Sequence, residues 1–460
     1  MQFEKKSIWQ QIDKDTNEKI YEYAEEYKAF LDNAKTEREA TRFIISAAKE
    51  KGFISLDEAL DGKIKKGDKI YLNNKNKSVV LFVIGDDIEE GLNIVGSHID
   101  SPRLDLKGNP LYEDSSLALF KTHYYGGVKK YQWPTIALSL HGYFRDRDGN
   151  EHNIVIGEDE NDPVFYINDL LPHLAKDQNS KTLKDAIKGE DLNIVVGHST
   201  YGVEGDENPI KRNILTILKE KYNLDEEDFA FAEFEAVPAQ KAKDVGFDRA
   251  MIASHGHDDR VCSYANLKAI LEVEDPKKTA VALFVDKEEI GSVGNTAMTS
   301  MFFENALAEI INNMGEYSDL KVRRALAKSS VLSADVSAAL DPSFKEVSDD
   351  KNEAQVGYGI AMAKYTGSGG KGGSNDANPE YISKLRDLFR REDVIWQISG
   401  FGKVDQGGGG TIAYILAKYG AEVVDMGTAM LSMHAPVELV SKADAYMTYK
   451  AYKAFLDKFE

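Results

Sequence analysis

The sequence predicts an α/β protein whose layered domain is interrupted by a β-rich insertion. Buried-strand runs alternate with helical segments towards both ends of the chain, whereas residues 106–234 consist of short hairpin-like pieces. The chain also has 460 residues, more than one hydrophobic core usually supports. We therefore expect a layered α/β domain from residues 1–105 and 235–460, and a separate inserted domain at 106–234.

The first part of the chain carries two kinds of pattern. Apolar side chains recur at helical spacing through residues 8–51, which predicts two amphipathic helices that end near Gly52 and cover the core. The runs VVLFVIG at 79–85 and NIVGSHID at 93–100 are almost continuously apolar, as in strands buried on both faces. Such runs suit the middle of a sheet.

The insertion and the second half of the chain differ in the order of their expected strands and helices. In the insertion we expect strands at 136–144, 152–157 and 191–199, a turn at Asp148-Gly149, and a helix over LLPHLAK at 170–176. After residue 235, strands at 280–286, 329–335, 357–363, 395–401 and 421–427 alternate with helices around 303–314, 379–391 and 411–419, and a final helix spans 441–460.

Composition narrows the class of partner and the compartment. The 57 basic residues against 77 acidic ones give a net charge of −20, which argues against nucleic acid and anionic membranes as partners. The single cysteine, Cys262, cannot form an internal disulfide. No stretch is apolar over the eighteen or so residues that a membrane span needs, and the N-terminal residues lack a signal-peptide pattern. We expect a cytoplasmic protein.

Potential metal ligands stand at the ends of predicted strands, where α/β proteins form their sites. They are His98 with Asp100, Asp258 with Asp259, Glu288 with Glu289, Asp335, and His434. Two first-row cations about 3.5 to 4 Å apart need a bridging carboxylate, further nitrogen or oxygen ligands and a shared water. The sequence therefore offers the donor types of a dinuclear site, although these donors accept several divalent ions.

The spacing of these residues suggests separate roles. If its strand continues, Asp100 projects from the same face as His98 and can accept the second imidazole N–H. Asp258 precedes the apolar stretch VCSYANLKAI and would stand at a helix N-terminus, a favourable place for an anion. Glu288 and Glu289 follow a buried strand, where successive extended positions point opposite ways. One of them could bind metal while the other moves a proton.

Each of these residues also has an ordinary interpretation. A single strand-end histidine is more often a hydrogen-bonded structural residue, an Asp pair is more often a solvated loop, and paired glutamates often lie on the surface. His255 and His257, which flank Gly256 just before Asp258, are weaker ligand candidates. The joint pattern favours a metal site, because independent ordinary explanations would have to hold at five places in one chain.

Five motifs follow one another over nearly the full length of the chain: GSHIDSPRLDLK, HDDRV, DKEEIGS, SADVSAALDPSF and MGTAMLSMHAPVE. Together they resemble the aspartyl aminopeptidase family of dinuclear metallopeptidases. The resemblance implies a zinc-peptidase-like three-layer α/β/α domain interrupted by a dimerisation domain, with dimers assembled into a tetrahedral dodecamer. It also implies two divalent metal ions per subunit, with zinc as the expected ion and cobalt or manganese as alternatives.

The resemblance assigns a role to each motif residue. The ligands that it implies are Asp258, Glu289 and His434 for one ion, and Asp258, His98 and Asp335 for the other. Asp258 would bridge the two ions. Glu288 would be the general base, and Asp100 would orient His98. The implied activity is removal of the N-terminal residue from peptides with a free N-terminus.

Two segments depart from the family pattern near the substrate. After the ligand aspartate the family is rich in histidine, whereas this chain has Ser337, Ala338 and Asp341. His173 is kept in a segment that reaches a neighbouring subunit's site in the family, but Asp177 stands where the family has a second histidine. These changes disfavour an acidic substrate side chain.

Two glycine-rich segments bear on the same question. Lys371, in TGSGGKGGSNDAN, is the counterpart of a family lysine that binds an acidic side chain. Asp405, in GFGKVDQGGGGT, could contact the substrate's α-amine or a basic side chain. A preference for a basic or neutral first residue therefore stays open beside the acidic preference of the family.

Other classes of protein fit less well. GSGGKGGS lacks the spacing of a nucleotide-binding loop, since Gly372 follows Lys371, and no G-x-S-x-G elbow of a serine hydrolase occurs. Cys262 is better explained as a buried thiol than as a nucleophile. A carboxypeptidase or deacylase would need a cationic clamp for a substrate carboxylate. A catalytically silent metal-binding assembly protein is the alternative from another class, but it has no use for a proton-shuttling glutamate.

Overall fold

The computed structural model describes residues 6–200 and 207–460, and it divides into two compact units. The first unit contains the described residues up to Asp100, with Ala242–Met433 and Glu438–Glu460. The second contains the described residues of Ser101–Lys241, with His434–Val437. These divisions lie a few residues from those expected at 105/106 and 234/235, because the strands that begin at Arg103 and end at Pro238 both belong to the second unit.

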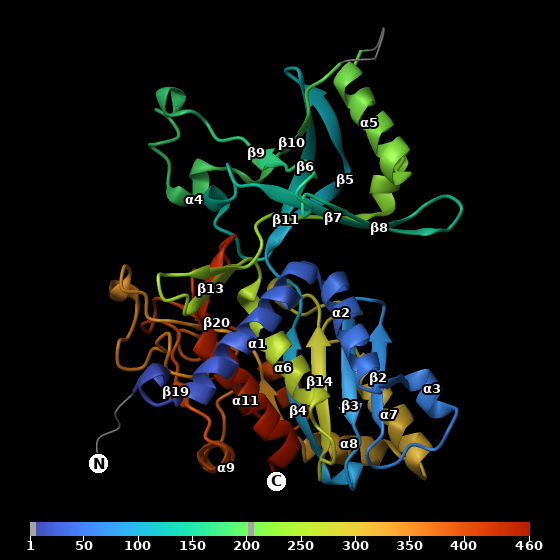
Figure 1. The fold of residues 1–460 in the computed structure, drawn as a ribbon, viewed down its shortest axis with the longest axis vertical. Helices are drawn as coiled ribbons and strands as arrows, with labels where there is room; N and C mark the ends of the chain where they lie inside the picture. The colour runs from blue at the N-terminus through green and yellow to red at the C-terminus, as the bar shows by residue number, and fades with distance from the viewer. Residues whose placement is uncertain (1–5, 201–206) are drawn as a thin grey trace. The chain divides into compact units, whose positions relative to one another are not determined.

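A nine-stranded sheet forms the centre of the first unit (Figure 1). Its strands, in spatial order, are β1 (Ile54–Ser55), β2 (Lys69–Asn74), β3 (Ser78–Val83), β14 (Thr279–Val285), β4 (Leu92–His98), β15 (Ser330–Ser333), β21 (Glu422–Gly427), β17 (Ile360–Ala363) and β19 (Trp396–Ile398). Strand β4 runs parallel to both β14 and β15, so the carboxyl ends of these three strands lie at one edge of the sheet.

Helices cover both faces of this sheet, which makes three layers. One face packs against α1 (Lys14–Asn33), α2 (Glu37–Glu50), α6 (His257–Leu271), α9 (Pro379–Arg391) and α11 (Lys442–Lys458). The other packs against α3 (Leu56–Leu60), α7 (Phe302–Met314), α8 (Asp319–Ala327) and α10 (Ala413–Ala417). The expected α/β/α arrangement is confirmed.

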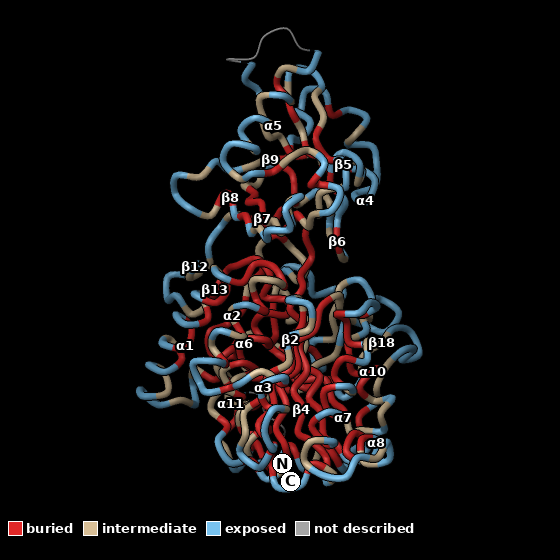
Figure 2. The backbone as a smooth tube through the Cα atoms, turned by 90° about the vertical axis from the view of Figure 1, so that its right-hand side faces the viewer, coloured by how far each residue is buried: buried red, intermediate tan, exposed pale blue. Residues whose placement is uncertain are grey.

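Strand sequence explains why two apolar cores form. In β3, Val79 and Leu81 point to one core while Val80 and Phe82 point to the other, because successive side chains alternate across a strand. The central strands are therefore buried along their length, as the red tube around β4 shows (Figure 2). The continuous apolar runs predicted this burial correctly.

The two helices expected within residues 8–51 are confirmed as α1 and α2; α2 ends at Glu50, close to Gly52, whereas α1 begins only at Lys14. Asp13 caps α1 by accepting the N–H of Thr16, and α2 begins with a capping box formed by Thr36 and Glu39. Gly52 follows α2 with a positive φ of 83°. Local signals thus set the ends of these helices, and their apolar faces then pack on the sheet.

Two smaller sheets complete the first unit. The first contains β12 (Lys243–Val245), β13 (Met251–Ser254), β23 (Glu438–Ser441), β22 (Ala429–Leu431) and β16 (Ser337–Ala338). The second pairs β18 (Gly367–Ser368) with β20 (Gly408–Gly409). Strands β13 and β16 begin or end within four residues of Asp258 and Asp335, so this five-stranded sheet helps to place both.

The second unit is a seven-stranded antiparallel sheet with its own apolar core. Its strands, in spatial order, are β8 (Glu151–Ile156), β7 (Leu138–Arg145), β11 (Glu233–Pro238), β5 (Arg103–Asp114), β6 (Leu117–Tyr125), β10 (Ile194–Gly197) and β9 (Tyr166–Ile167). Its helices are α4 (Leu183–Ala186) and α5 (Pro209–Tyr222), and Ile210 of α5 lies in the core.

One expected helix of this unit is wrong. The segment LLPHLAK forms only a single 3-10 turn at Pro172–Leu174. Leu171 and Leu174 are 49% and 67% exposed, so the segment has no apolar surface on which a longer helix could pack.

No helix in residues 6–200 or 207–460 combines the length and the apolar character needed to cross a membrane.

Candidate metal centre

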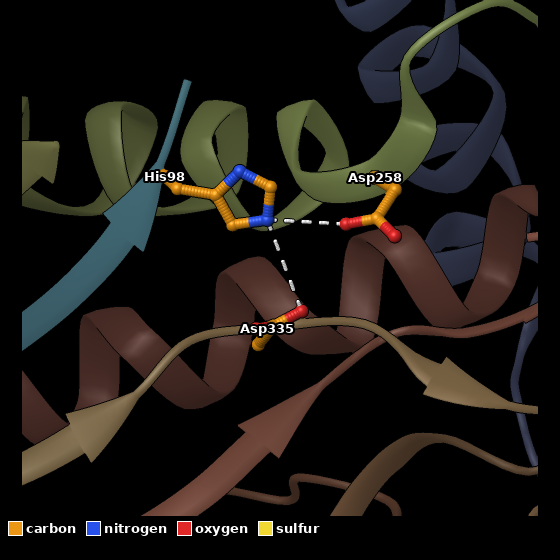
Figure 3. A group of neighbouring side chains, drawn as sticks. All are labelled: His98, Asp258 and Asp335. Carbon is orange, nitrogen blue, oxygen red and sulfur yellow. Dashed lines mark hydrogen bonds and ion pairs between the residues drawn. The ribbon is translucent and has the colours of Figure 1, made fainter. Parts of the chain in front are cut away.

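Three of the predicted ligands converge at the edge of the central sheet (Figure 3). His98 ends β4, Asp258 lies in the first turn of α6, and Asp335 follows β15. The Nε2 atom of His98 lies 3.1 Å from Oδ1 of Asp258 and 4.0 Å from Oδ1 of Asp335. Ligands held about 2.0 to 2.2 Å from one ion lie about 3 to 4 Å from each other, so these separations suit a single metal.

Strand register explains the convergence of His98 and Asp335. Ser333, the last residue of β15, pairs with Gly96 of β4, so both chains leave the sheet at the same level. Gly427 lets the turn at Asp335 lie close to β21, because a Cβ atom there would stand 1.8 Å from the Asp335 carbonyl oxygen. A larger residue at 427 would push this ligand away, a requirement that the sequence did not signal.

Asp100 lies against the second nitrogen of His98. Nδ1 is 3.1 Å from the Asp100 carbonyl oxygen and 3.3 Å from its carboxylate Oδ1, and both of these atoms can only accept a hydrogen bond. Nδ1 therefore donates to Asp100, and Nε2 faces Asp258 and Asp335. A metal bound there would take the place of the Nε2 proton, while Asp100 continued to hold Nδ1.

The same carboxylate also holds the turn that carries the two glutamates. Oδ1 of Asp100 accepts the N–H of Glu288 at 3.1 Å, and Oδ2 accepts the N–H of Glu289 at 3.2 Å. The expectation that these glutamates occupy successive extended positions is wrong, because they lie in a 3-10 helix at Glu288–Ile290. The chain turns there because Lys287 has a φ of 68° and Gly291 one of 98°, which brings both N–H groups towards Asp100.

Glu289 nevertheless lies beside Asp258. Carboxylate oxygens of these two residues approach within 4.8 Å of each other, whereas Glu288 stands one position earlier in the turn. Both glutamate side chains are half-buried. The 3-10 turn therefore places the Glu289 carboxylate next to Asp258 and leaves the Glu288 carboxylate available for another role.

The backbone of Asp258 is fixed by a hydrogen bond from its own N–H group. Residues 258 and 259 interrupt the helical geometry at the start of α6, and Oε2 of the buried Glu438 accepts the N–H of Asp258 at 3.1 Å. His257 is not among the converging ligands: its Nδ1 lies 2.7 Å from the Tyr27 hydroxyl and its Nε2 lies 3.2 Å from the Ile252 carbonyl oxygen. Burial lowers the pKa of His257 to about 3, so its ring is neutral.

The electrostatics of the centre favour a cation. Burial raises the pKa of Asp335 well above its usual range, and the negative charge of Glu288 raises it further. Burial alone would lower the pKa of His98, but its hydrogen bonds with Asp100 and Asp258 outweigh that effect and raise it well above normal. Acidic groups are therefore packed close to one another beside His98. A divalent ion among one imidazole and these carboxylates would relieve the repulsion, and the donor set suits zinc.

His434 lies in the four-residue segment His434–Val437, which belongs to the second unit. Within that unit its Nδ1 is 3.1 Å from the Gly127 carbonyl oxygen, so Nδ1 carries the proton and Nε2 has the lone pair. Its part in the metal centre stays a prediction from the sequence.

The comparisons with known proteins agree with this chemistry. Residues 30–456 match the sequence profile of the aminopeptidase I zinc metalloproteases, M18. The chain belongs to the M18 family of zinc metalloproteases. It is 50% identical over 457 residues to a probable M18 family aminopeptidase 1 of Clostridium acetobutylicum, over 99% of this chain and 98% of the relative.

Solved structures share the fold of this M18 aminopeptidase. The crystal structure of an M18 family aminopeptidase from Thermotoga maritima matches it with a TM-score of 0.94 and 43% identity, over 99% of this chain and 100% of the other. A structure of the mApe1 dodecamer of S. cerevisiae has the same fold with a TM-score of 0.74 and 20% identity, over 94% and 95% of the two chains. Family membership makes the chain a metal-dependent aminopeptidase, so the catalytically silent alternative is set aside.

Lys371 is predicted from the sequence to contact the substrate of this M18 aminopeptidase. Nζ of Lys371 lies 2.9 Å from Oδ2 of Asp376 and 3.7 Å from the centroid of the Tyr365 ring. Lys371 lines a pocket of about 290 Å³ together with the acidic residues Asp349, Asp350 and Glu353. Its ammonium group therefore already has an anionic and an aromatic partner.

The other predicted substrate contacts lie apart from Lys371 in the sequence. Asp405 has a φ of 68°, in the loop before β20. Asp341 accepts the N–H of Ser343 at 2.8 Å. In the second unit His173 and Asp177 are both exposed, and the Asp177 carbonyl accepts the Ser180 hydroxyl at 2.8 Å. Their roles towards substrate stay predictions.

Proposed function

We propose that this M18 aminopeptidase binds two divalent cations, preferably zinc, and that both would share the Asp258 carboxylate. His98 and Asp335 would complete the first ion, and Glu289 and His434 the second. The convergence of His98, Asp258 and Asp335 within 4.8 Å at the carboxyl ends of parallel strands is the observation that carries the proposal. The approach of Glu289 to Asp258 supports the second ion.

Each residue of the centre then has a task in peptide hydrolysis. When bound, two such cations supply Lewis-acid polarisation of a carbonyl and make a nearby water more acidic. Glu288 takes a proton from the attacking water and returns it to the nitrogen of the leaving amine. Asp100 fixes the imidazole of His98 and, through two N–H groups, the turn that presents Glu288.

We further propose that the first residue of the substrate is neutral or basic in preference to acidic. The Lys371 ammonium group is paired with Asp376, and three other acidic side chains line the same pocket. An acidic substrate side chain would have to compete with Asp376 and would meet those carboxylates. Lysine or leucine at the first position meets neither obstacle.

We also propose an assembly and a compartment for the protein. The second unit would be a dimerisation domain, and the resemblance in sequence suggests dimers joined into a tetrahedral dodecamer. The single cysteine fits the reducing cytoplasm. Light scattering of the purified protein would test the assembly, and a monomer at micromolar concentration would contradict it.

The ligand assignment is tested by metal stoichiometry. Asp258→Asn removes a negative charge shared by both ions, so we expect bound zinc to fall from two per subunit to one or none after dialysis. Asp444→Asn is the matched control, because Asp444 is also a fully buried aspartate but accepts backbone N–H groups. Two zinc ions retained in Asp258→Asn would refute the bridging role.

The residue preference is tested by assaying aspartyl, glutamyl, lysyl and leucyl anilides side by side. We expect the highest kcat/KM for the lysyl or leucyl substrate. Fastest turnover of the aspartyl or glutamyl substrate would overturn this preference and leave the metal centre unaffected.

A further inference from the structure

Tyr27 connects the N-terminal helix α1 to the start of α6. Its hydroxyl lies 2.7 Å from Nδ1 of His257, a residue 230 positions later in the chain. Both side chains are fully buried. His257 immediately precedes Asp258, so the contact reaches the backbone of the residue on which the proposed metal centre depends.

The hydrogen bonds of the His257 ring have one consistent arrangement. Nε2 faces the Ile252 carbonyl oxygen at 3.2 Å, and a carbonyl oxygen can only accept, so Nε2 carries the proton. In the neutral ring Nδ1 is then an acceptor, and the Tyr27 hydroxyl donates to it. The imidazole is therefore anchored at both nitrogens, by α1 on one side and by β13 on the other.

The backbone beside this ring does not have helical geometry of its own. Asp258 has φ −81° and ψ 106°, inside what is otherwise the first turn of α6. Its N–H is accepted by Glu438 at 3.1 Å, which fixes the peptide on the side of Asp258. On the side of His257, the Gly256 carbonyl accepts the N–H of Arg260 at 3.3 Å, and the His257 ring contacts Tyr27 and Ile252.

We propose that Tyr27 is a positioning residue of the metal centre, acting through His257 to hold the Asp258 carboxylate in line with His98 and Asp335. This inference rests on Asp258 being a metal ligand, as proposed above. Groups that hydrogen-bond around ligating residues commonly change metal affinity or activity about 10- to 100-fold when they are removed. Loss of the Tyr27 hydroxyl leaves Nδ1 without its donor and lets the ring and the adjoining peptide move.

A matched control lies one turn earlier on the same helix. Tyr23 is also buried, at 4% exposure, and belongs to the same aromatic cluster: its ring centroid is 5.4 Å from that of Tyr264, and the Tyr27 centroid is 5.5 Å from it. The Tyr23 hydroxyl, however, has no hydrogen-bond partner among the residues that the structure describes. Removing either hydroxyl changes the packing alike, but removing that of Tyr27 alone breaks a path to Asp258.

The experiment measures zinc affinity in full-length Tyr27→Phe and Tyr23→Phe by competition with a chromophoric chelator. We expect the weakest-bound zinc of Tyr27→Phe to dissociate about tenfold more readily than in the unmodified protein. Tyr23→Phe should stay within about twofold, and thermal unfolding of the metal-free proteins should agree between the two variants. Equal zinc affinity in both variants, whether unchanged or reduced, would overturn the proposal.

A double-variant cycle tests the path through His257. If Tyr27 acts through that ring, Tyr27→Phe combined with His257→Gln should lose no more zinc affinity than His257→Gln alone. Losses that multiply would show that Tyr27 does not act through His257, and would overturn the inference.

Asp258→Asn, measured in the same assay, separates this inference from the proposal on which it rests. If Asp258→Asn binds zinc like the unmodified protein, the proposed metal centre fails and this inference fails with it. If Asp258→Asn loses zinc while Tyr27→Phe does not, the role of Tyr27 alone fails.

Discussion

Two aspartates of the first unit differ in what surrounds them: Asp335, whose side chain is 13% exposed, and Asp444, which is fully buried. Asp444 stands in the first turn of α11 and accepts the N–H groups of Gly357 at 2.6 Å and Gly359 at 2.7 Å. Asp335 has the acidic residues Asp258 and Glu288 near enough to raise its pKa. Backbone donors thus stabilise one carboxylate, whereas the other belongs to a group of acids that repel each other.

This difference shows which buried acids indicate a metal. Burial raises the pKa of both aspartates, so burial by itself does not separate them. The separating feature is whether the group's neighbours are N–H donors or further acids together with an imidazole. A carboxylate that accepts backbone N–H groups stabilises the fold, whereas one surrounded by further acids and an imidazole indicates a cation-binding site.

The largest expected effect is the loss of turnover when Glu288, an acidic neighbour of Asp335, is substituted. Glu288→Gln keeps the size of the side chain but removes its ability to take a proton, so kcat should fall about 100- to 10,000-fold while bound zinc stays at two per subunit. Steady-state kinetics with a metal analysis of the same sample measure both. Glu309→Gln, on the exposed face of α7, is the control and should be fully active. A normal rate for Glu288→Gln would refute its role as base.

Asp444, the aspartate that accepts backbone N–H groups, is expected to make the stability of the protein depend on pH. Burial raises the pKa of Asp444 from 3.8 to about 7, although hydrogen bonds from Gly357 and Gly359 oppose the rise. The folded protein keeps this proton up to about pH 7, whereas the unfolded chain releases it near pH 4, so the free energy of unfolding falls as pH rises between these values. The fall attributable to Asp444 is on the order of 4 kcal/mol.

Asp444→Asn tests this effect, because the amide does not titrate. Urea unfolding of the metal-free proteins at pH 4 to 7 should show a shallower decline for the variant than for the unmodified protein. A loss of one N–H contact would lower stability equally at each pH and leave the slope unaffected. Identical slopes would place the titration of Asp444 outside this range.

A smaller effect is expected from substitution of Asp100, which both accepts backbone N–H groups and contacts a proposed metal ligand. Asp100 accepts two backbone N–H groups, as Asp444 does, but it also contacts the imidazole of His98. Asp100→Asn should lower zinc affinity or kcat/KM by about 10- to 100-fold, because the amide can satisfy only part of this set. Zinc competition and initial-rate assays would measure it. If neither changes, the carboxylate does not support the site.

Much of the fold, and the convergence of His98 with Asp335, could be predicted because the signals are local. His98 and Asp335 each stand at the end of a short run that predicts a buried strand, and parallel neighbours bring strand ends together. The ends of α1 and α2 follow from their caps and from Gly52. These features depend on a few adjacent residues, which the sequence displays directly.

The features that could not be predicted depend on contacts between distant residues. The 3-10 turn at Glu288 forms with Asp100, which lies 188 positions away. Tyr27 and Glu438 fix the backbone of residues 257 and 258 from elements far along the chain, and no pattern around either residue marks it. The missing helix at LLPHLAK has the same cause, since its leucines find no surface to pack on.

The proposed dinuclear centre requires Asp258 to lie between two cations. Anomalous diffraction at the zinc edge from crystals grown with zinc would test it most directly. We predict two peaks flanking the Asp258 carboxylate, one in contact with His98 and Asp335 and the other with Glu289 and His434. A single peak, or peaks whose ligands exclude Asp258, would contradict the account.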